Sequence, residues 1–365
     1  MRSTETPTSE IPEPDPEGAA KYGRSRTRFI VVQGIILAAG VALLIYLLYS
    51  LGLSTIYETV TRIGWGFLII VAINGIRHVL RAYCLYLAIH SENRSVSFHN
   101  VFAARLAGEA VNLMTITGPF LGDATKVALL QRKQTLTHSA AAVIVDNILY
   151  YTTVGVMILS GVGLLVVTVG EFDNATRYAL AIVVTLVMLM LIGLAAAVKY
   201  DIKPLSFVLK RLDRKGLLPR SIASKRDYIR EIETSVFSVY HERPGTFYLL
   251  LFIGMLTHAI SVWEVHLALG MLGFDPGVIK SFIIESLNKI INFAFSFVPG
   301  AVGVYEGGNA LFLRILGYSS AVGVALALVR RGAILFWTAI GVLVLIYRTA
   351  LRSKRQLSER LQEEA

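Results

Sequence analysis

Ionisable and amide residues recur inside apolar segments of this sequence, at spacings that could do chemistry. Glu109 and Asn112 are matched by Glu285 and Asn288, and the Glu-x-x-Asn spacing puts each pair on one helical face. A charged side chain at membrane depth costs at least ~2.5 kcal/mol on insertion scales, so it must face a cavity or a partner. Each glutamate can be protonated, paired or solvated. We expect Glu109 and Glu285, together with Glu306, to gate a pathway or to carry protons.

Basic residues lie in the same kind of segment. Arg77 and Arg81 share one helical face, and guanidinium groups bind phosphate through two parallel hydrogen bonds, so the pair predicts a phosphate-binding stripe. The alternative is that Arg81 extends to the cytoplasmic surface while Arg77 pairs with an acid such as Asp146. Arg105 lies four residues before Glu109 and can form an ion pair with it on a helix.

Two proline–glycine breaks follow the two Glu-x-x-Asn motifs. Gly118-Pro119 is followed by Asp123 and Lys126, and Pro299-Gly300 is followed by Glu306. The exposed N–H groups at the start of a half-helix favour an anion, which makes a headgroup phosphate one candidate ligand there. A simple helix cap made by the acidic side chain is the alternative.

Asp146 and the pair Arg330-Arg331 complete the set, and mutual pairing across a helix bundle is the simplest expectation for them. Glu264 lies near His258 and His266, but this spacing does not bring all three onto one helical face, so we expect no metal site. The candidate substrate-binding and translocation residues are Arg77, Arg81, Glu109, Asn112, Asp123, Lys126, Asp146, Glu285, Asn288, Pro299, Gly300, Glu306, Arg330 and Arg331.

Composition excludes several classes of protein. Of the 365 residues 55% are hydrophobic and only 16% are charged, and the mean hydropathy is +0.61, whereas soluble domains carry about 25% charged residues. The single cysteine, Cys84, allows no internal disulfide. There is no Gly-x-x-x-x-Gly-Lys-[Ser/Thr] loop, no Gly-x-Ser-x-Gly elbow and no His-Glu-x-x-His motif. We therefore expect a membrane protein with no catalytic set, no cofactor and no nucleic-acid partner.

Apolar runs predict an all-α integral membrane protein. Two regions, Val101–Leu130 and Val278–Leu316, are interrupted near the middle, and lipid tolerates such broken backbone only beside protein or a watery cavity, so we expect re-entrant helical hairpins. The first uninterrupted run is too long for a signal-peptide core and should remain as an anchor. The six predicted transmembrane helices are Phe29–Leu51, Trp65–Ile89, Ser139–Val169, Tyr178–Val198, Thr246–Leu272 and Ser319–Tyr347.

The distribution of lysine and arginine predicts the orientation. Residues 199–245 carry eleven such residues, and the two ends of the chain carry five each, whereas the loops around Glu58, Glu171 and Asp275 carry one each. Because cytoplasmic loops are enriched in these residues, both termini should lie in the cytoplasm of a cell whose inner membrane holds the protein. The first hairpin then enters from the cytoplasm and the second from outside.

The two hairpins predict an inverted repeat. Repeat one covers residues 65–169 and repeat two covers 246–347, each as span, hairpin and span with opposite sense, which is a recurring plan of transporters. The basic connector 199–245 should hold an amphipathic interfacial helix between Pro219 and Pro244, with a solvated linker helix as the alternative. A disordered tail, 1–28, and a charged cytoplasmic tail, 348–365, flank the membrane domain 29–347.

These motifs together resemble the flippase-like transmembrane domain of lysylphosphatidylglycerol synthases and its stand-alone relatives. The resemblance runs from about residue 65 to 347. The matching stretches are Gly108-Glu109-x-x-Asn112, Gly122-Asp123-x-x-Lys126-x-x-Leu129-Leu130, Pro299-Gly300-x-x-Gly303-x-x-Glu306-Gly307, Leu316-Gly317 and Arg330-Arg331.

The resemblance implies a polytopic inner-membrane protein that moves or handles lipids, which in relatives are aminoacylated phosphatidylglycerol or hopanoid and polyisoprenyl-linked molecules. Two departures stand out. The synthases carry a soluble acyltransferase-like domain after the membrane part, whereas this sequence extends 18 residues beyond Tyr347, so we expect a stand-alone member. The first break reads Asn112-Leu-Met-Thr-Ile-Thr-Gly118-Pro119-Phe, where many relatives have a proline followed by small and basic residues, so the substrate is expected to differ.

We therefore expect a lipid translocase that moves a phospholipid or a polyisoprenyl or hopanoid-type lipid between leaflets, as a monomer or an oligomer. A non-catalytic membrane partner of a lipid-modifying or cell-envelope enzyme is the second hypothesis. The third is a polyisoprenyl pyrophosphate phosphatase, which would need a nucleophilic serine and an arginine beside the second break, where the sequence reads Pro299-Gly-Ala-Val-Gly-Val-Tyr-Glu306.

Overall fold

The computed structural model describes residues 58, 61–90, 95–115, 117–131, 135–214 and 226–363 of the chain, and these contain helices and turns but no strand. Within this part of the chain, five helices are long and apolar enough to cross a membrane. They are α3 (Gly66–Ala88), α6 (Leu136–Val169), α7 (Asn174–Lys199), α11 (Pro244–Met271) and the Ser320–Arg348 part of α14 (Ser320–Glu363).

These five helices match five of the six predicted spans. The first predicted span, Phe29–Leu51, lies outside the described residues, as does the tail 1–28. Helix α6 begins three residues earlier than predicted because the Thr135 side chain caps it, accepting a hydrogen bond from the His138 N–H. It ends at Gly170, whose φ of +78° suits a residue without a Cβ.

Each interrupted region folds as two short helices that pack against each other. The first consists of α4 (Phe98–Met114) and α5 (Gly118–Leu130); the second consists of α12 (Gly277–Ala294), the 3₁₀ turn η2 (Pro299–Ala301) and α13 (Val304–Ile315). Each of the four α-helices is shorter than the ~20 residues that a spanning helix needs. The helices break at the predicted positions, because proline begins α5 and residues 300 and 303, both glycines, adopt positive φ.

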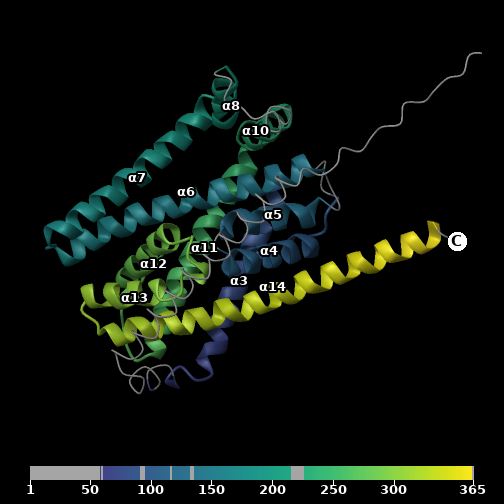
Figure 1. Cartoon of the computed structure of the whole chain (residues 1–365). Coiled ribbons are helices and arrows are strands. Elements are labelled where there is room, and N and C mark those ends of the chain that lie inside the picture. The colour runs from purple at the N-terminus through teal and green to yellow at the C-terminus, as the bar shows by residue number, and fades with distance from the viewer. Residues whose placement is uncertain are drawn as a thin grey trace, which may run out of the picture.

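The long helices pack so that the two broken segments lie between them. Helix α3 contacts α11, while α4 packs on α14 and α12 packs on α6 (Figure 1). Two glycines permit the last two contacts: a Cβ at Gly341 of α14 would overlap the Leu106 carbonyl of α4, and one at Gly161 of α6 would overlap Ser286 of α12.

Buried apolar side chains of the described residues form three clusters, and a polar layer separates the two larger ones. On α3, Ile70 and Val71 belong to one cluster and Leu85 and Ala88 to the other. Helices α6 and α11 likewise contribute to both clusters at opposite ends. Arg77 and Arg81 of α3 and Glu264 of α11 lie between the residues that these helices contribute to the two larger clusters, whereas Asp146 of α6 lies beside members of the second cluster.

The described part of the connector, 199–214 and 226–245, contains the helices α8 (Pro204–Arg214) and α10 (Arg226–His241), which lie together at the end of α7 (Figure 1). Both the backbone N–H and the hydroxyl of Ser206 donate to the Glu233 carboxylate, and Arg226 pairs with Asp213 at 2.7 Å. Helix α10 packs on α6 and α11 and buries Val239. It therefore braces two membrane helices. The predicted start near Pro219 lies outside the described residues.

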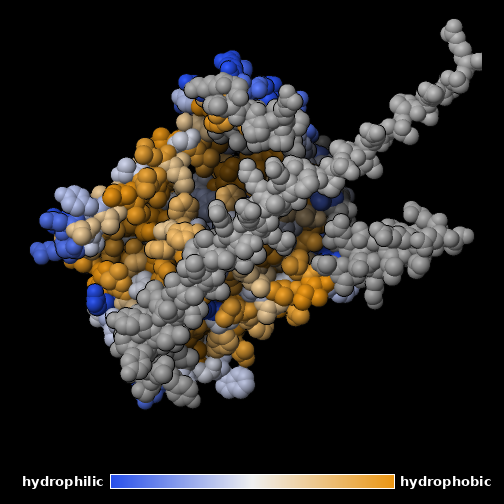
Figure 2. Space-filling view, in the orientation of Figure 1, coloured by the Kyte–Doolittle hydropathy of each residue, from blue (hydrophilic) through white to orange (hydrophobic). Residues whose placement is uncertain are grey.

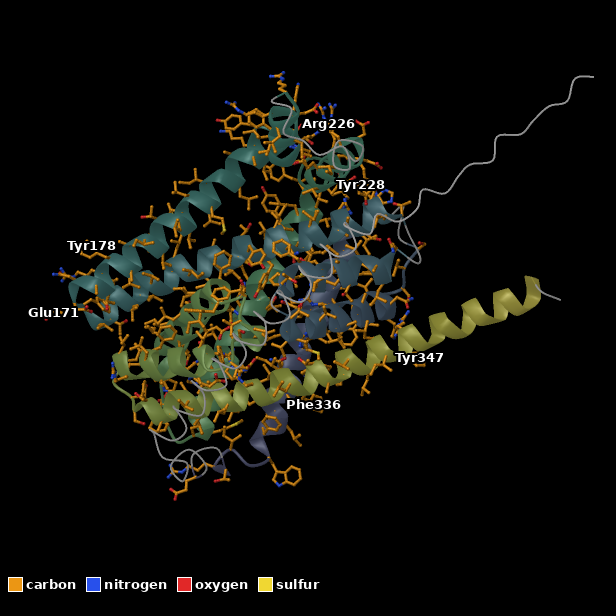
Figure 3. The ribbon with its side chains drawn as sticks, viewed as in Figure 1. Glu171, Tyr178, Arg226, Tyr228, Phe336 and Tyr347 are labelled. Atoms are coloured by element: carbon orange, nitrogen blue, oxygen red, sulfur yellow. The ribbon has the colours of Figure 1, made fainter. Side chains whose placement is uncertain are left out.

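The surface agrees with a membrane location. Hydrophobic side chains form a broad band over the helices, while hydrophilic ones gather over α8 and α10 and at the opposite end, where α6 turns into α7 (Figure 2). Glu171 and Tyr178 lie at that second end, far from Arg226 and Tyr228 at the first (Figure 3). Helix α7 has no fully buried residue: one face, with Leu180, Val183, Val184 and Val187, packs partly buried against α6, and many of its other apolar side chains are exposed.

Candidate functional site

A cavity of about 740 Å³ lies in the polar layer between the two larger apolar clusters. Its walls come from α3, α4, α5, α6, α11, α12, α14 and the η2 turn, so both breaks open onto it. Leu113, near the end of α4, packs close to Gly300 of η2, which brings the tips of the two broken segments together. The cavity thus combines charged walls with broken backbone, as the sequence leads one to expect.

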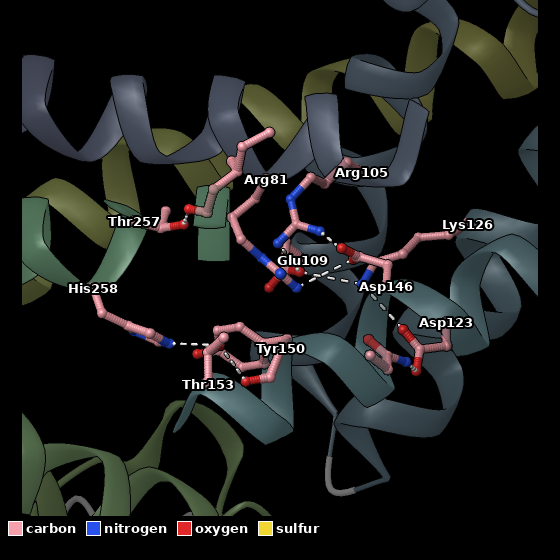
Figure 4. A network of polar contacts seen from close by, with 12 residues as sticks. Arg81, Arg105, Glu109, Asp123, Lys126, Asp146, Tyr150, Thr153, Thr257 and His258 are labelled. Carbon is pink, nitrogen blue, oxygen red and sulfur yellow. Dashed lines mark hydrogen bonds and ion pairs between the residues drawn. The ribbon is translucent and has the colours of Figure 1, made fainter. Parts of the chain in front are cut away.

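Asp146 on α6 is the centre of the first ion-pair network (Figure 4). Its Oδ2 accepts hydrogen bonds from Arg81 of α3 at 3.1 Å and from Arg105 of α4 at 3.2 Å. Arg105 also pairs with Glu109 at 3.2 Å, as their spacing predicts. The Arg81 guanidinium lies 4.1 Å from the centre of the Tyr150 ring, which adds a cation–π contact. One carboxylate therefore holds two guanidinium groups from two other helices.

Lys126 extends this network to the helix that begins at the first break. Its Nζ lies 3.2 Å from the Glu109 carboxylate and 3.0 Å from that of Asp123, and Asn147 of α6 donates to the same Asp123. Glu109 and Asp123 keep 31% and 30% of their side-chain surfaces exposed, whereas Lys126 keeps 5%. The two carboxylates are therefore the accessible members of this group.

Arg330 on α14 is the centre of the second network. Its Nε donates to Glu264 of α11 at 2.9 Å, its Nη1 pairs with Glu285 of α12 at 2.8 Å, and Nη1 also donates to the Tyr305 hydroxyl. Lys289 pairs with Glu285 at 2.7 Å. Here one guanidinium holds two carboxylates, which reverses the charges of the first network.

Arg77 of α3 belongs to the second network, whereas Arg81 on the same helix belongs to the first. The Nη1 of Arg77 lies 2.9 Å from Glu264, and 23% of its side-chain surface is exposed. Its buried Nε has no hydrogen-bond partner among the described residues. The alternative expectation for these two arginines is half confirmed: Arg77 does pair with an acid, but that acid is Glu264. Arg81 does not extend to the surface, because it is 8% exposed and itself holds Asp146. One helical turn separates the two arginines on α3, so Arg77 faces α11 and Arg81 faces α6.

Arg331 closes the second break. Its guanidinium pairs with Glu306 and donates to the carbonyls of Gly300 at 2.9 Å and Ala301 at 3.3 Å. Glu306 accepts the Gly303 N–H at 2.8 Å and caps α13. The anion at this half-helix start is therefore the protein's own carboxylate, as in the helix-cap alternative, and Arg331 satisfies carbonyls that the break leaves free.

Asn288 lies deeper in the same segment. Its side-chain amide exchanges two hydrogen bonds with that of Asn309, at 3.2 and 2.9 Å, and this clasp ties α12 to α13. Asn112, its counterpart in the first segment, lines the cavity instead and packs on Gly118 and Gly122.

Most of the predicted site residues line the cavity, and the rest lie outside its lining. Asp146, Asn288, Pro299 and Glu306 do not line the cavity. The ten that do are Arg77, Arg81, Glu109, Asn112, Asp123, Lys126, Glu285, Gly300, Arg330 and Arg331.

Sequence reasoning missed several cavity residues. Glu264 was considered only as a metal ligand, yet it is fully buried and pairs with two arginines, and no metal cluster exists among the described residues. A glutamate inside an apolar run is itself the signal that should have placed it in the network. His78, Tyr150 and Trp337 carried no comparable signal, because such residues are common in apolar helices. Arg105 was predicted only as the ion-pair partner of Glu109. The remaining polar lining residues outside the predicted site set are Asn74, Asn147, Tyr151, Thr257, His258, Lys289, Asn292, Ser296, Tyr305 and Thr338.

The networks as a whole carry one more positive than negative charge. Seven cations pair with six carboxylates. The cations are Arg77, Arg81, Arg105, Lys126, Lys289, Arg330 and Arg331, and the carboxylates are those of Glu109, Asp123, Asp146, Glu264, Glu285 and Glu306. A cavity with a single uncompensated cation is suited to an anionic group.

This architecture defines a multi-pass α-helical membrane protein whose broken helices enclose a charged internal cavity. The chain belongs to the family described as the lysylphosphatidylglycerol synthase TM region, whose model matches residues 30–341. Comparisons with curated proteins and with solved structures found no match. The family match confirms the resemblance and places the chain among membrane proteins associated with lipids.

Proposed function

We propose that this protein is a lipid translocase, in which the cavity holds the headgroup while the hydrocarbon tails remain in the bilayer. The observation that carries the proposal is the cavity itself, because a mixed-charge pocket within the apolar part of a membrane protein gives a polar headgroup a route that lipid does not offer. The substrate would be a phospholipid or a polyisoprenyl or hopanoid-type lipid.

The rim of the cavity supports this division between headgroup and tails. Phe120 at the start of α5, Phe293 at the end of α12 and Leu335 on α14 line the cavity and are largely exposed. Inside, the excess positive charge and the free Nε of Arg77 favour a phosphate group. A lipid with its phosphate near Arg77 and Arg81 could leave its tails among the exposed apolar side chains.

Helix contacts support the inverted-repeat architecture that alternating access needs. If α3 to α6 form one unit and α11 to α14 the other, the contact of α4 with α14 has a counterpart in that of α12 with α6. The contact of α3 with α14 likewise corresponds to that of α11 with α6, and α3 and α11 contact each other. Such exchange is expected of two units related by an in-plane two-fold axis. We further propose an inner-membrane location with both termini cytoplasmic.

Reconstitution tests this proposal. Purified protein in liposomes that contain fluorescent headgroup-labelled phosphatidylglycerol should make labelled lipid of the inner leaflet accessible to dithionite. Arg77→Ala should reduce the rate at least tenfold, since it removes one ion-pair partner of Glu264 and the free Nε donor. Arg177→Ala, on the exposed start of α7, is the matched control and should leave the rate unchanged. Unaltered movement in Arg77→Ala would contradict the assigned pathway.

A lipid panel separates the rival functions. No movement of phosphatidylglycerol, aminoacylated lipid or polyisoprenyl lipid would favour the role of membrane partner to a lipid-modifying enzyme, which co-purification would then test. Release of inorganic phosphate would favour the phosphatase. Against that activity, the guanidinium of Arg331 beside the second break is already engaged by Glu306 and the carbonyls of Gly300 and Ala301.

A further inference from the structure

His258 on α11 is a titratable cavity residue without a charged partner. It lines the cavity, is 4% exposed and makes no ion pair among the described residues. The cavity-lining carboxylates differ in this respect: Glu109 pairs with two cations, and so does Glu285. Protonating either glutamate would deprive cations such as Lys126 of a partner, whereas protonating an imidazole breaks no ion pair.

The hydrogen bonds of Thr153 define which nitrogen of His258 is free. The Thr153 hydroxyl donates to the Tyr150 carbonyl at 2.8 Å, so its single hydrogen is already used. It can therefore only accept from His258 Nε2, which lies 3.0 Å away (Figure 4). Nε2 carries a hydrogen in this arrangement, and Nδ1 keeps its lone pair, with no hydrogen-bond partner in the described part of the chain.

The surroundings make the charge of His258 sensitive to the contents of the cavity. Burial among the packed helices disfavours a charge on the imidazole, and four charged residues lie within its electrostatic reach: Lys289 and Glu285 of α12 and Arg77 and Arg81 of α3. Cations outnumber acids among these four residues, so a proton on His258 adds repulsion that an incoming anion would offset.

The other helices around His258 do not reverse this balance. Arg330 of α14 is bound to Glu285, and the Tyr150 ring of α6 lies 5.6 Å from the imidazole and already carries the Arg81 guanidinium on its face. On α11 itself, Glu264 is shared by Arg77 and Arg330. No carboxylate in this part of the chain is left over to neutralise a protonated His258, so the anion must come from a ligand.

We propose that His258 is a proton-binding site, and that a proton at its Nδ1 accompanies an anionic headgroup into the cavity. Because coupling between two ligands is reciprocal, the headgroup favours proton uptake as much as the proton favours headgroup binding. A pH difference across the membrane then drives lipid from one leaflet to the other, with the proton taken up on one side and released on the other. This inference rests on the proposed translocase function.

A gradient experiment tests the coupling. Proteoliposomes of phosphatidylcholine with trace headgroup-labelled phosphatidylglycerol receive a one-unit pH difference, and the leaflet distribution of label is read by dithionite. One proton per lipid gives up to about tenfold accumulation, because one pH unit corresponds to ~1.4 kcal/mol. His258→Gln can still donate to Thr153 but cannot be protonated in this range, and its accumulation ratio should fall to one. His266→Gln, on the same helix but outside the cavity, should keep the response.

The outcomes separate the inference from the function on which it rests. Lipid movement in the unaltered protein without accumulation, or accumulation that persists in His258→Gln, overturns the proton site and leaves the translocase standing. Absence of movement under every condition overturns the translocase. If His258→Gln stops movement altogether, proton uptake decides: dihexanoylphosphatidylglycerol added to the protein in weakly buffered detergent should cause uptake of about one proton per protein. The His258→Gln variant should show none, and equal uptake in both overturns the site.

Discussion

Asp146 and Arg330 occupy the centres of two ion-pair networks with opposite signs. Asp146 on α6 accepts hydrogen bonds from arginines of α3 and α4, and Arg330 on α14 binds glutamates of α11 and α12. In each case the last helix of a proposed unit ties the first helix to the broken one. The central residue and its two partners carry opposite charges in the two networks, yet the networks connect corresponding helices. The electric field therefore differs between the two halves of the cavity, and the halves can attract different groups.

Neutralising Asp146 should destabilise the protein more than neutralising Arg330, because the two substitutions leave different ion-pair partners in place. Asp146→Asn leaves Arg81 with no ion pair among the described residues, whereas Arg330→Gln leaves Glu264 with Arg77 and Glu285 with Lys289. Removing one member of a buried ion pair costs ~3–5 kcal/mol when the other is stranded. We expect Asp146→Asn to lower the thermal unfolding midpoint in detergent more than Arg330→Gln does.

A second substitution makes that test specific. Asp146→Asn combined with Arg81→Gln should recover part of the lost stability, because it removes the stranded charge. Glu171→Gln, at the exposed turn after α6 (Figure 3), is the control and should leave the midpoint where it is. Equal losses in Asp146→Asn and Arg330→Gln would show that the networks are not organised around these contacts.

Arg331 should determine the order of the second break. Arg331→Lys can keep the ion pair with Glu306 but lacks the planar fork that reaches the carbonyls of Gly300 and Ala301. A hydrogen bond to a charged group contributes ~1.5–3 kcal/mol, so amide hydrogen exchange in a peptide covering residues 295–303 should quicken by about tenfold or more. Arg314→Lys, exposed on α13, is the matched control, and the same acceleration there would remove the special role of Arg331.

The spans and the breaks could be predicted because both are local properties of the sequence. A run of about 20 apolar residues and a proline–glycine pair need no knowledge of distant neighbours, and α3, α7 and α11 match their predicted ranges within a few residues. Helix α8 was not predicted, although its apolar residues recur at helical spacing between charged ones and make it the most amphipathic of the described helices.

The sequence predicts that the buried charged residues form ion pairs, but in most cases it does not predict which residues pair with each other. The insertion penalty requires that Arg77, Arg81 and Asp146 find partners, but the partners are 41 to 187 positions apart in sequence, and one helical turn decides between α6 and α11. The Arg105–Glu109 pair is the exception, since four residues on one helix suffice to bring its members together. The other ion pairs depend on how helices that are distant in sequence pack together, and the sequence pattern does not show this packing.

Close helix packing at Gly341 should be intolerant of larger side chains. Gly341→Leu places atoms onto the Leu106 carbonyl, a backbone group that cannot turn away, and overpacking of this kind costs ~1–3 kcal/mol. We expect a lower unfolding midpoint in detergent and the same direction of change for Gly161→Leu, which meets Ser286. Gly193→Leu on α7 has open space around its Cβ and should leave the midpoint unchanged. A neutral Gly341→Leu would mean that α4 and α14 do not pack so closely.

Cysteine labelling tests the proposed orientation and exploits the single buried cysteine. In a Cys84→Ser background, Glu171→Cys introduces a thiol at the turn between α6 and α7, and Lys210→Cys introduces one on α8 at the opposite end of the molecule. Because the connector carries the excess of lysine and arginine, it should face the cytoplasm. A membrane-impermeant maleimide added to whole cells should therefore label Glu171→Cys at once and Lys210→Cys only after permeabilisation. The reverse order would invert the orientation, and labelling of both positions from outside would contradict the assignment of α7 as a membrane span.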